Sequence, residues 1–166
     1  MAEFRLYHFV GPDGYPPEWH ATLKHLVREL AGYRCVRCFH PYKNGEHGSG
    51  EWTPCDEQCR HRGGTIKTDD EGRTWAAWRI LTVHHLDGNK LNCRWWNLAA
   101  LCQRCHLTIQ GRVKLHRPWL LDHSEWFKPY VAGYYAWSRL GLELTREQTI
   151  ARLDELLTLG REVAHA

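Results

Sequence analysis

The sequence predicts an α+β fold in which a small core of strands and one helix lies between helical flanks. Two Cys-x-x-Cys pairs, one beginning at Cys35 and one ending at Cys105, stand before and after an apolar strand candidate. Stretches near both ends of the chain repeat apolar residues at helical spacing. Hydrophobic residues make up 43% of the 166 residues, which is enough for a packed core.

In the first half of the chain, a short strand is expected at 4–10, followed by a turn cluster rich in Gly and Pro. A helix is expected from Pro17, which the first turn accepts, to Gly32, which favours a helix end. Residues 39–74 are polar and rich in Gly and lack periodicity, so we expect a long insertion without regular structure.

In the second half, the aromatic and apolar run 75–84 predicts a strand, and 86–92 predicts a loop with Asp-Gly and Gly-Asn turns. A knuckle that runs into a helix is expected over 102–115. The stretch 119–137 is expected to be partly helical. A last helix should begin near Thr145, where Thr-x-x-Gln fits a capping box. These elements suggest three parts, with boundaries 1–32, 33–118 and 119–166.

The charge distribution favours a nucleic-acid partner for the middle of the chain. The net charge is only +3, but the stretch between Ala76 and Pro118 contains seven basic residues and a single acidic residue, Asp87. A basic segment in a nearly neutral chain is typical of a phosphate-binding surface, although a solvated charged face gives the same pattern. The candidate phosphate contacts are Arg79, Lys90, Arg94, Arg104, Arg112 and Lys114.

The N-terminal residues do not resemble a signal peptide, and no apolar run approaches the length of a membrane span. We therefore expect a cytoplasmic protein without a membrane partner. In a reducing compartment seven cysteines favour metal binding over disulfides. Four thiolates in two Cys-x-x-Cys pairs can hold one structural zinc ion tetrahedrally, and the expected ligands are Cys35, Cys38, Cys102 and Cys105.

A second zinc site is a weaker candidate within the polar insertion. Its expected ligands are His47, Cys55, Cys59 and His61, a looser pattern than the Cys-x-x-Cys pairs. Free surface thiols are the alternative, although exposed cysteines are reactive. Cys93 remains, and we expect it to be a buried or half-buried thiol.

The segment from the predicted strand through the second cysteine pair reads Val-His84-His85-Leu-Asp-Gly and then Asn97-Leu-Ala-Ala-Leu-Cys-Gln-Arg-Cys-His106. This pattern resembles that of the HNH endonuclease family. The similarity covers about 33–116. It implies a ββα-metal finger stapled by a four-cysteine zinc knuckle, with flanking N- and C-terminal helices.

The resemblance also implies roles for four residues. His85 would be the general base, His84 and His106 would bind a catalytic divalent ion, and Asn97 would brace the loop and orient His85. An imidazole suits the base because its pKa lies near physiological pH. Mg²⁺ or Mn²⁺ is the expected ion. Many relatives carry Asp where His84 stands, and because a histidine nitrogen is a softer ligand than a carboxylate oxygen, Ni²⁺ or Zn²⁺ stays open.

The expected function is therefore that of a metal-dependent DNA endonuclease that hydrolyses phosphodiester bonds, cutting or nicking its substrate. The sequence leaves its assembly state open: it could act as a homodimer or within a larger phage, restriction or defence assembly. A non-catalytic zinc module that binds nucleic acid or protein would keep the cysteines without needing the histidines. A thiol redox protein is the third reading, and it leaves the histidines unexplained.

Overall fold

The computed structural model describes residues 4–43, 51–52, 56–60, 66–68, 70–71, 74–76, 80–109 and 124–161. The chain forms two compact units. The first unit comprises Met1–Pro17, His85–Leu98 and Gly111–Ala166, and the second comprises Glu18–His84 and Ala99–Gln110. The boundaries predicted after residues 32 and 118 stay predictions.

The second unit begins with one continuous helical segment. A π-helical turn η1, Trp19–Leu23, passes into α1, Lys24–Leu30. Trp19, Leu23 and Val27 form its buried side, as the apolar spacing predicted. Leu30 has the helical spacing of these residues but is 60% exposed, because the helix ends there and the chain turns at Gly32, whose φ is +59°.

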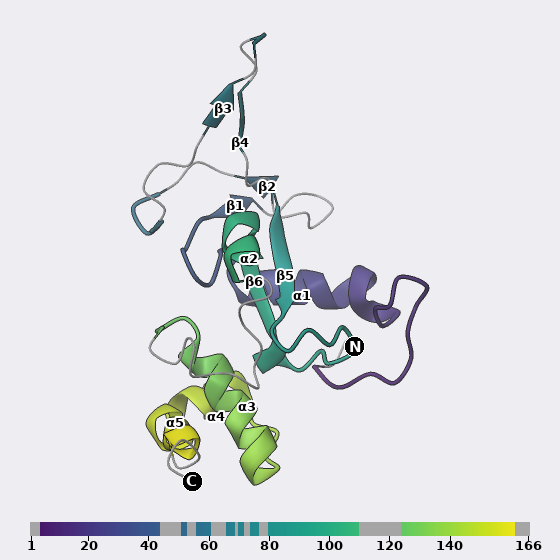
Figure 1. Ribbon diagram of the computed structural model, residues 1–166, viewed down its shortest axis with the longest axis vertical. Coiled ribbons are helices and arrows are strands. Elements are labelled where there is room, and N and C mark those ends of the chain that lie inside the picture. The colour runs from purple at the N-terminus through teal and green to yellow at the C-terminus, as the bar shows by residue number, and fades with distance from the viewer. Residues whose placement is uncertain are drawn as a thin grey trace. The chain divides into compact units, whose positions relative to one another are not determined.

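Two strands and a helix carry the predicted knuckle. Strand β5, Leu81–His85, pairs with β6, Leu98–Cys102, and α2, Gln103–Ile109, follows β6 directly (Figure 1). Every residue of β6 is buried, so this strand lies inside the unit rather than at its surface. The Arg28 side chain of α1 donates from Nε to the Leu81 carbonyl oxygen at 2.7 Å, which fastens the helix to β5.

The polar insertion contains short strands, and most of them were not predicted. β1, Tyr42–Lys43, pairs antiparallel with β2, Glu51–Trp52, and β3, Ile66–Thr68, pairs antiparallel with β4, Thr74–Ala76. β4 overlaps the start of the strand predicted over 75–84, whereas β1, β2 and β3 had no such prediction. Strands of two or three residues are too short to show an alternating pattern, so periodicity cannot reveal them. The expectation of a run without regular structure was therefore wrong for these residues.

In the first unit, the expected strand at 4–10 is reduced to one bridge between Leu6 and Asn92. Tyr7 N donates to the Leu91 carbonyl at 2.9 Å and so joins the N-terminal segment to the predicted loop. A short 3-10 turn, η2, Trp95–Asn97, follows that loop.

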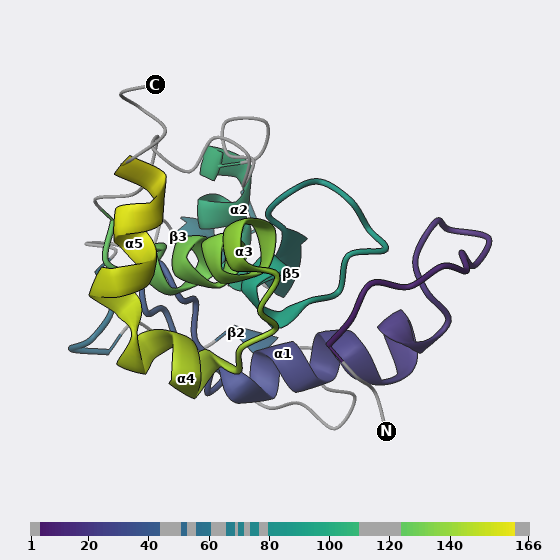
Figure 2. The ribbon, with the colours of Figure 1, turned by 90° about the horizontal axis from the view of Figure 1, so that it is seen from below.

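Three helices complete the first unit: α3, Lys128–Leu140, α4, Arg146–Ala151, and α5, Leu153–Arg161 (Figure 2). The capping box at Thr145 is present, with Gln148 N donating to the threonine hydroxyl and the glutamine side chain accepting from Thr145 N. Their core is formed by Ala132, Ala136 and Leu156, which are completely buried. Over the part of the chain that is described, no helix combines the length and the hydropathy of a membrane span.

Candidate metal centre and catalytic residues

The two Cys-x-x-Cys pairs meet, as predicted. The sulfur atoms of Cys35, Cys38, Cys102 and Cys105 all lie within 4.8 Å of one another, and all four residues are buried. Cys38 Sγ lies 3.7 Å from Cys102 Sγ. Two thiolates of a tetrahedral zinc site, each about 2.3 Å from the ion, are about 3.8 Å apart. The group therefore has the donor chemistry and the spacing of a structural Zn²⁺ site.

The backbone around this cluster fixes both knuckles. Val36 N donates to the Ala100 carbonyl at 2.9 Å, which joins the first knuckle to β6, and Cys105 N donates to Cys102 Sγ at 3.3 Å. Zinc binds cysteine as the thiolate, so a cation held between the four sulfurs would stabilise their charged form within this buried cluster.

His84 and His106 lie beside each other in the second unit. His84 comes from β5 and His106 from α2, and their ring centroids are 4.6 Å apart. His106 directly follows the zinc-ligand candidate Cys105, so the knuckle sets its position along the chain. The structure therefore brings together the two histidines that the resemblance implies as ligands of a divalent ion.

A threonine determines the protonation of the His106 ring. Thr82 Oγ1 donates its only hydrogen to the Leu101 carbonyl oxygen at 2.8 Å and lies 3.1 Å from His106 Nδ1. Because the hydroxyl has no second hydrogen, it must accept from Nδ1–H. The lone pair of the neutral ring is then on Nε2. Metal-binding histidines are commonly oriented in this way, with the other ring nitrogen donating to a protein oxygen.

Burial favours the neutral form of both imidazoles. Burial, with a further contribution from the neighbouring His106, lowers the pKa of His84 to about 4. Burial also lowers the pKa of His106. A neutral ring keeps the lone pair that a metal ligand needs.

His85, the predicted base, belongs to the first unit and is 6% exposed. The Tyr15 ring lies against it with a centroid separation of 5.8 Å. Cys93 Sγ lies 3.8 Å from His85 Nε2, and Cys93 is completely buried, as expected for this leftover thiol. The sequence did not indicate that Cys93 contacts a candidate catalytic residue.

Asn97 is completely buried and closes the loop that follows His85. Its Nδ2 donates to Asp87 Oδ1 at 2.8 Å and to the Asn92 carbonyl at 2.7 Å. Its Oδ1 accepts from Asp87 N at 2.8 Å, and its carbonyl accepts from Leu86 N at 2.8 Å. One amide side chain therefore ties together both ends of the loop between His85 and Asn92.

Among the candidate phosphate contacts, Arg94 already has partners within the first unit. It pairs with Glu143 at 3.1 Å and stacks over the Trp137 ring, with 4.8 Å from Cζ to the centroid. Lys90 Nζ lies 4.3 Å from the centroid of the Tyr15 ring and donates to the Asp13 carbonyl. Arg104 is exposed on α2. The remaining candidates lie outside the described residues: Arg79, Arg112 and Lys114.

Of the four residues predicted for a second zinc site, only Cys59 is described. His47, Cys55 and His61 lie outside the described residues. Cys59 Sγ lies 3.5 Å from Nδ1 of His40, a histidine that the sequence pattern did not single out. The signal that could have found it is its place two residues after Cys38, directly after the knuckle.

Comparison of the chain with family models, with curated proteins and with solved structures finds no match.

Proposed function

We propose that the protein is a metal-dependent DNA endonuclease of the HNH type. The observation that carries the proposal is the pair His84 and His106 next to the four-cysteine cluster. A nucleic-acid or protein-binding module that needs only a zinc knuckle has no use for two neutral histidines side by side, one of them held in a single tautomer by Thr82.

The donor set fits a catalytic divalent ion. His84 and His106 would hold it, and two protein ligands leave coordination positions for water and phosphate oxygens. When bound, the ion would neutralise charge on the scissile phosphate and stabilise the leaving 3′ oxygen. His106 would bind through Nε2, since Thr82 takes the Nδ1 hydrogen.

His85 would act as the general base that takes a proton from the attacking water. It directly follows His84 in the chain, and the loop after it is closed by the buried Asn97. Asn97 cannot serve as a base, because an amide does not take protons at neutral pH. Its hydrogen bonds instead support a positioning role, holding the backbone on which His85 stands.

The test is cleavage of supercoiled plasmid by zinc-loaded protein with Mg²⁺, Mn²⁺ or Ni²⁺, with and without chelator. Replacing His85 by Ala should lower the cleavage rate about 100-fold or more, because general-base catalysis contributes at least that factor. His8→Ala is the matched control, since His8 is exposed in the same unit. Zinc content and far-UV circular dichroism of both variants show whether they are folded.

Cleavage by His85→Ala at the wild-type rate would contradict the assignment of the base. A protein that shifts DNA in a gel but cuts it with none of these ions would contradict the proposed activity and favour the non-catalytic zinc module.

A further inference from the structure

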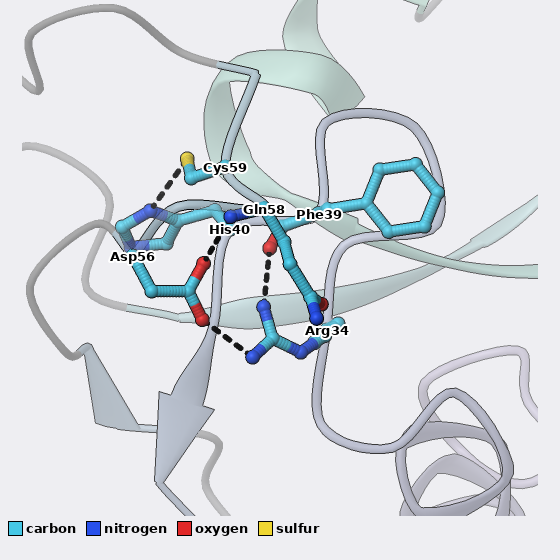
Figure 3. A network of polar contacts seen from close by, with 6 residues as sticks. All are labelled: Arg34, Phe39, His40, Asp56, Gln58 and Cys59. Atoms are coloured by element: carbon cyan, nitrogen blue, oxygen red, sulfur yellow. Dashed lines mark hydrogen bonds and ion pairs between the residues drawn. The ribbon is translucent and has the colours of Figure 1, made fainter.

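The polar insertion is joined to the first knuckle by a contact between a histidine and a cysteine, two residue types that bind zinc. His40 follows the Cys35–Cys38 knuckle and is 2% exposed, and Cys59 lies in the insertion. Figure 3 shows the imidazole of His40 turned toward the Cys59 sulfur, with 3.5 Å between Nδ1 and Sγ. Neither residue belongs to the four-cysteine group.

This separation is the one that a shared zinc ion requires. With Zn–S of about 2.3 Å, Zn–N of about 2.0–2.1 Å and a tetrahedral angle, a cysteine sulfur and a histidine nitrogen lie about 3.5–3.6 Å apart. The same arithmetic accounts for the 3.7 Å between Cys38 Sγ and Cys102 Sγ in the first cluster. A thiol–imidazole hydrogen bond also allows 3.5 Å, so the surroundings of the pair have to be considered.

A network around the pair holds Cys59 against His40. Asp56 accepts from the Arg34 guanidinium at 2.5 Å, and Arg34 also donates to the Phe39 carbonyl at 3.0 Å (Figure 3). On the other side of Cys59, Arg60 N donates to the Cys38 carbonyl at 2.7 Å. The segment that carries Cys59 is therefore tied to the knuckle on both sides, as a ligand-bearing segment must be.

The backbone at the knuckle adopts an unusual conformation next to His40. Phe39 has φ of +61°, a left-handed conformation that non-glycine residues rarely adopt. The His40 carbonyl nevertheless accepts from Cys35 N at 3.0 Å, and the imidazole packs edge-on against the Tyr42 ring at 5.0 Å. The His40 imidazole that follows this left-handed residue is buried and lies against Cys59 of the insertion.

We propose that His40 and Cys59 are two ligands of a second zinc ion, which staples the polar insertion to the first knuckle. The sequence supplies further donors beside Cys59, in Cys55 and His61, both outside the described residues. A long segment inside a compact domain is expected to be tied down, and bound metal contributes directly to folding. The proposal does not depend on the nuclease activity.

The test is the zinc content of the full chain, measured by mass spectrometry of the metal together with protein concentration. The wild type should hold two zinc ions per chain, and His40→Ala and Cys59→Ser should each hold one. His8→Ala and Cys93→Ala are matched controls that should keep two zinc ions per chain, because no contact described for either residue involves His40 or Cys59. One zinc in the wild type, or two in His40→Ala, would overturn the proposal.

Cobalt substitution of the wild type gives a second readout that does not depend on the folding of a variant. Two tetrahedral sites with different donors, four sulfurs in one and mixed sulfur and nitrogen in the other, should give two sets of visible bands with stepwise filling. A single set of four-sulfur bands that saturates at one cobalt per chain would contradict the second site.

Discussion

The hydroxyl of Thr82 determines which nitrogen of His106 carries a hydrogen. It donates to the Leu101 carbonyl and accepts from His106 Nδ1, so the imidazole is presented to a metal through Nε2. The orientation of the His106 ring depends on the hydroxyl oxygen of Thr82 and not on the shape of the side chain. Valine is therefore the informative substitution, because it keeps the shape of threonine and removes the hydroxyl.

Thr82→Val should weaken binding of Mn²⁺ or Ni²⁺ about 10- to 100-fold, which is the usual cost of losing an outer partner of a metal-binding histidine. Calorimetric titration of zinc-loaded protein measures it. Thr108→Val is the matched control, because the Thr108 hydroxyl donates to the Arg104 carbonyl on the exposed side of α2. Equal affinities for the Thr82 variant and the wild type would show that the hydroxyl does not orient a ligand.

The candidate site could be predicted from the sequence only where spacing carries the information. The Cys-x-x-Cys pairs and the neighbouring His84 and His85 stand at recognisable offsets. Thr82, Cys93 and His40 show no such offset, because their roles arise from contacts with residues between 8 and 24 positions away in the chain. Such contacts depend on the strand pairing and on the knuckle, which no local pattern encodes.

At the scale of elements, helix α3 packs unusually closely on the turn η2. Gly133 lies at this contact, and a Cβ atom added there would lie 2.7 Å from Trp96 Cβ and 2.8 Å from Trp95 Cζ2. The Trp95 indole nitrogen also donates to the Leu144 carbonyl at 2.8 Å, so the ring has little freedom to move aside.

Overpacking usually costs about 1–3 kcal/mol, and the gain in helix propensity from glycine to alanine offsets about 1 kcal/mol of it. Gly133→Ala should therefore lower the free energy of unfolding of the first unit by up to about 2 kcal/mol. Denaturant unfolding followed by tryptophan fluorescence measures it. Ser138→Ala, at an exposed position of the same helix, should leave stability nearly unchanged, and a stabilised Gly133→Ala protein would contradict the close packing.

Elements with local signals were predicted better than elements without them. The capping box at Thr145 depends on two side chains three residues apart, and it forms as expected. The strands of the polar insertion depend on partners across a gap in the chain, and most of them were missed. The tail helix was expected within 119–137, but α3 continues to Leu140. It ends there because the next residue, Gly141, adopts a left-handed conformation with φ of +66°.

At the scale of the whole molecule, the two units are stabilised in different ways. The second unit contains all four cysteine ligands, whereas the core of the first unit consists of apolar contacts of α3 with α5 around Ala132, Ala136 and Leu156. A structural zinc ion contributes about 10 kcal/mol or more in small zinc domains, as much as the whole stability of many proteins. Zinc removal should therefore act first on the second unit.

Hydrogen exchange with mass spectrometry after zinc chelation tests this in the full chain. Amide protection should be lost in α1, β6 and α2, while α3 and α5 keep most of theirs because their packing includes none of the four cysteines. Gly133→Ala with zinc bound is the complementary measurement, since it should lower protection in α3 and leave α2 unchanged. Loss of protection to the same extent in α2 and α3 after chelation would show instead that both units unfold as one cooperative body.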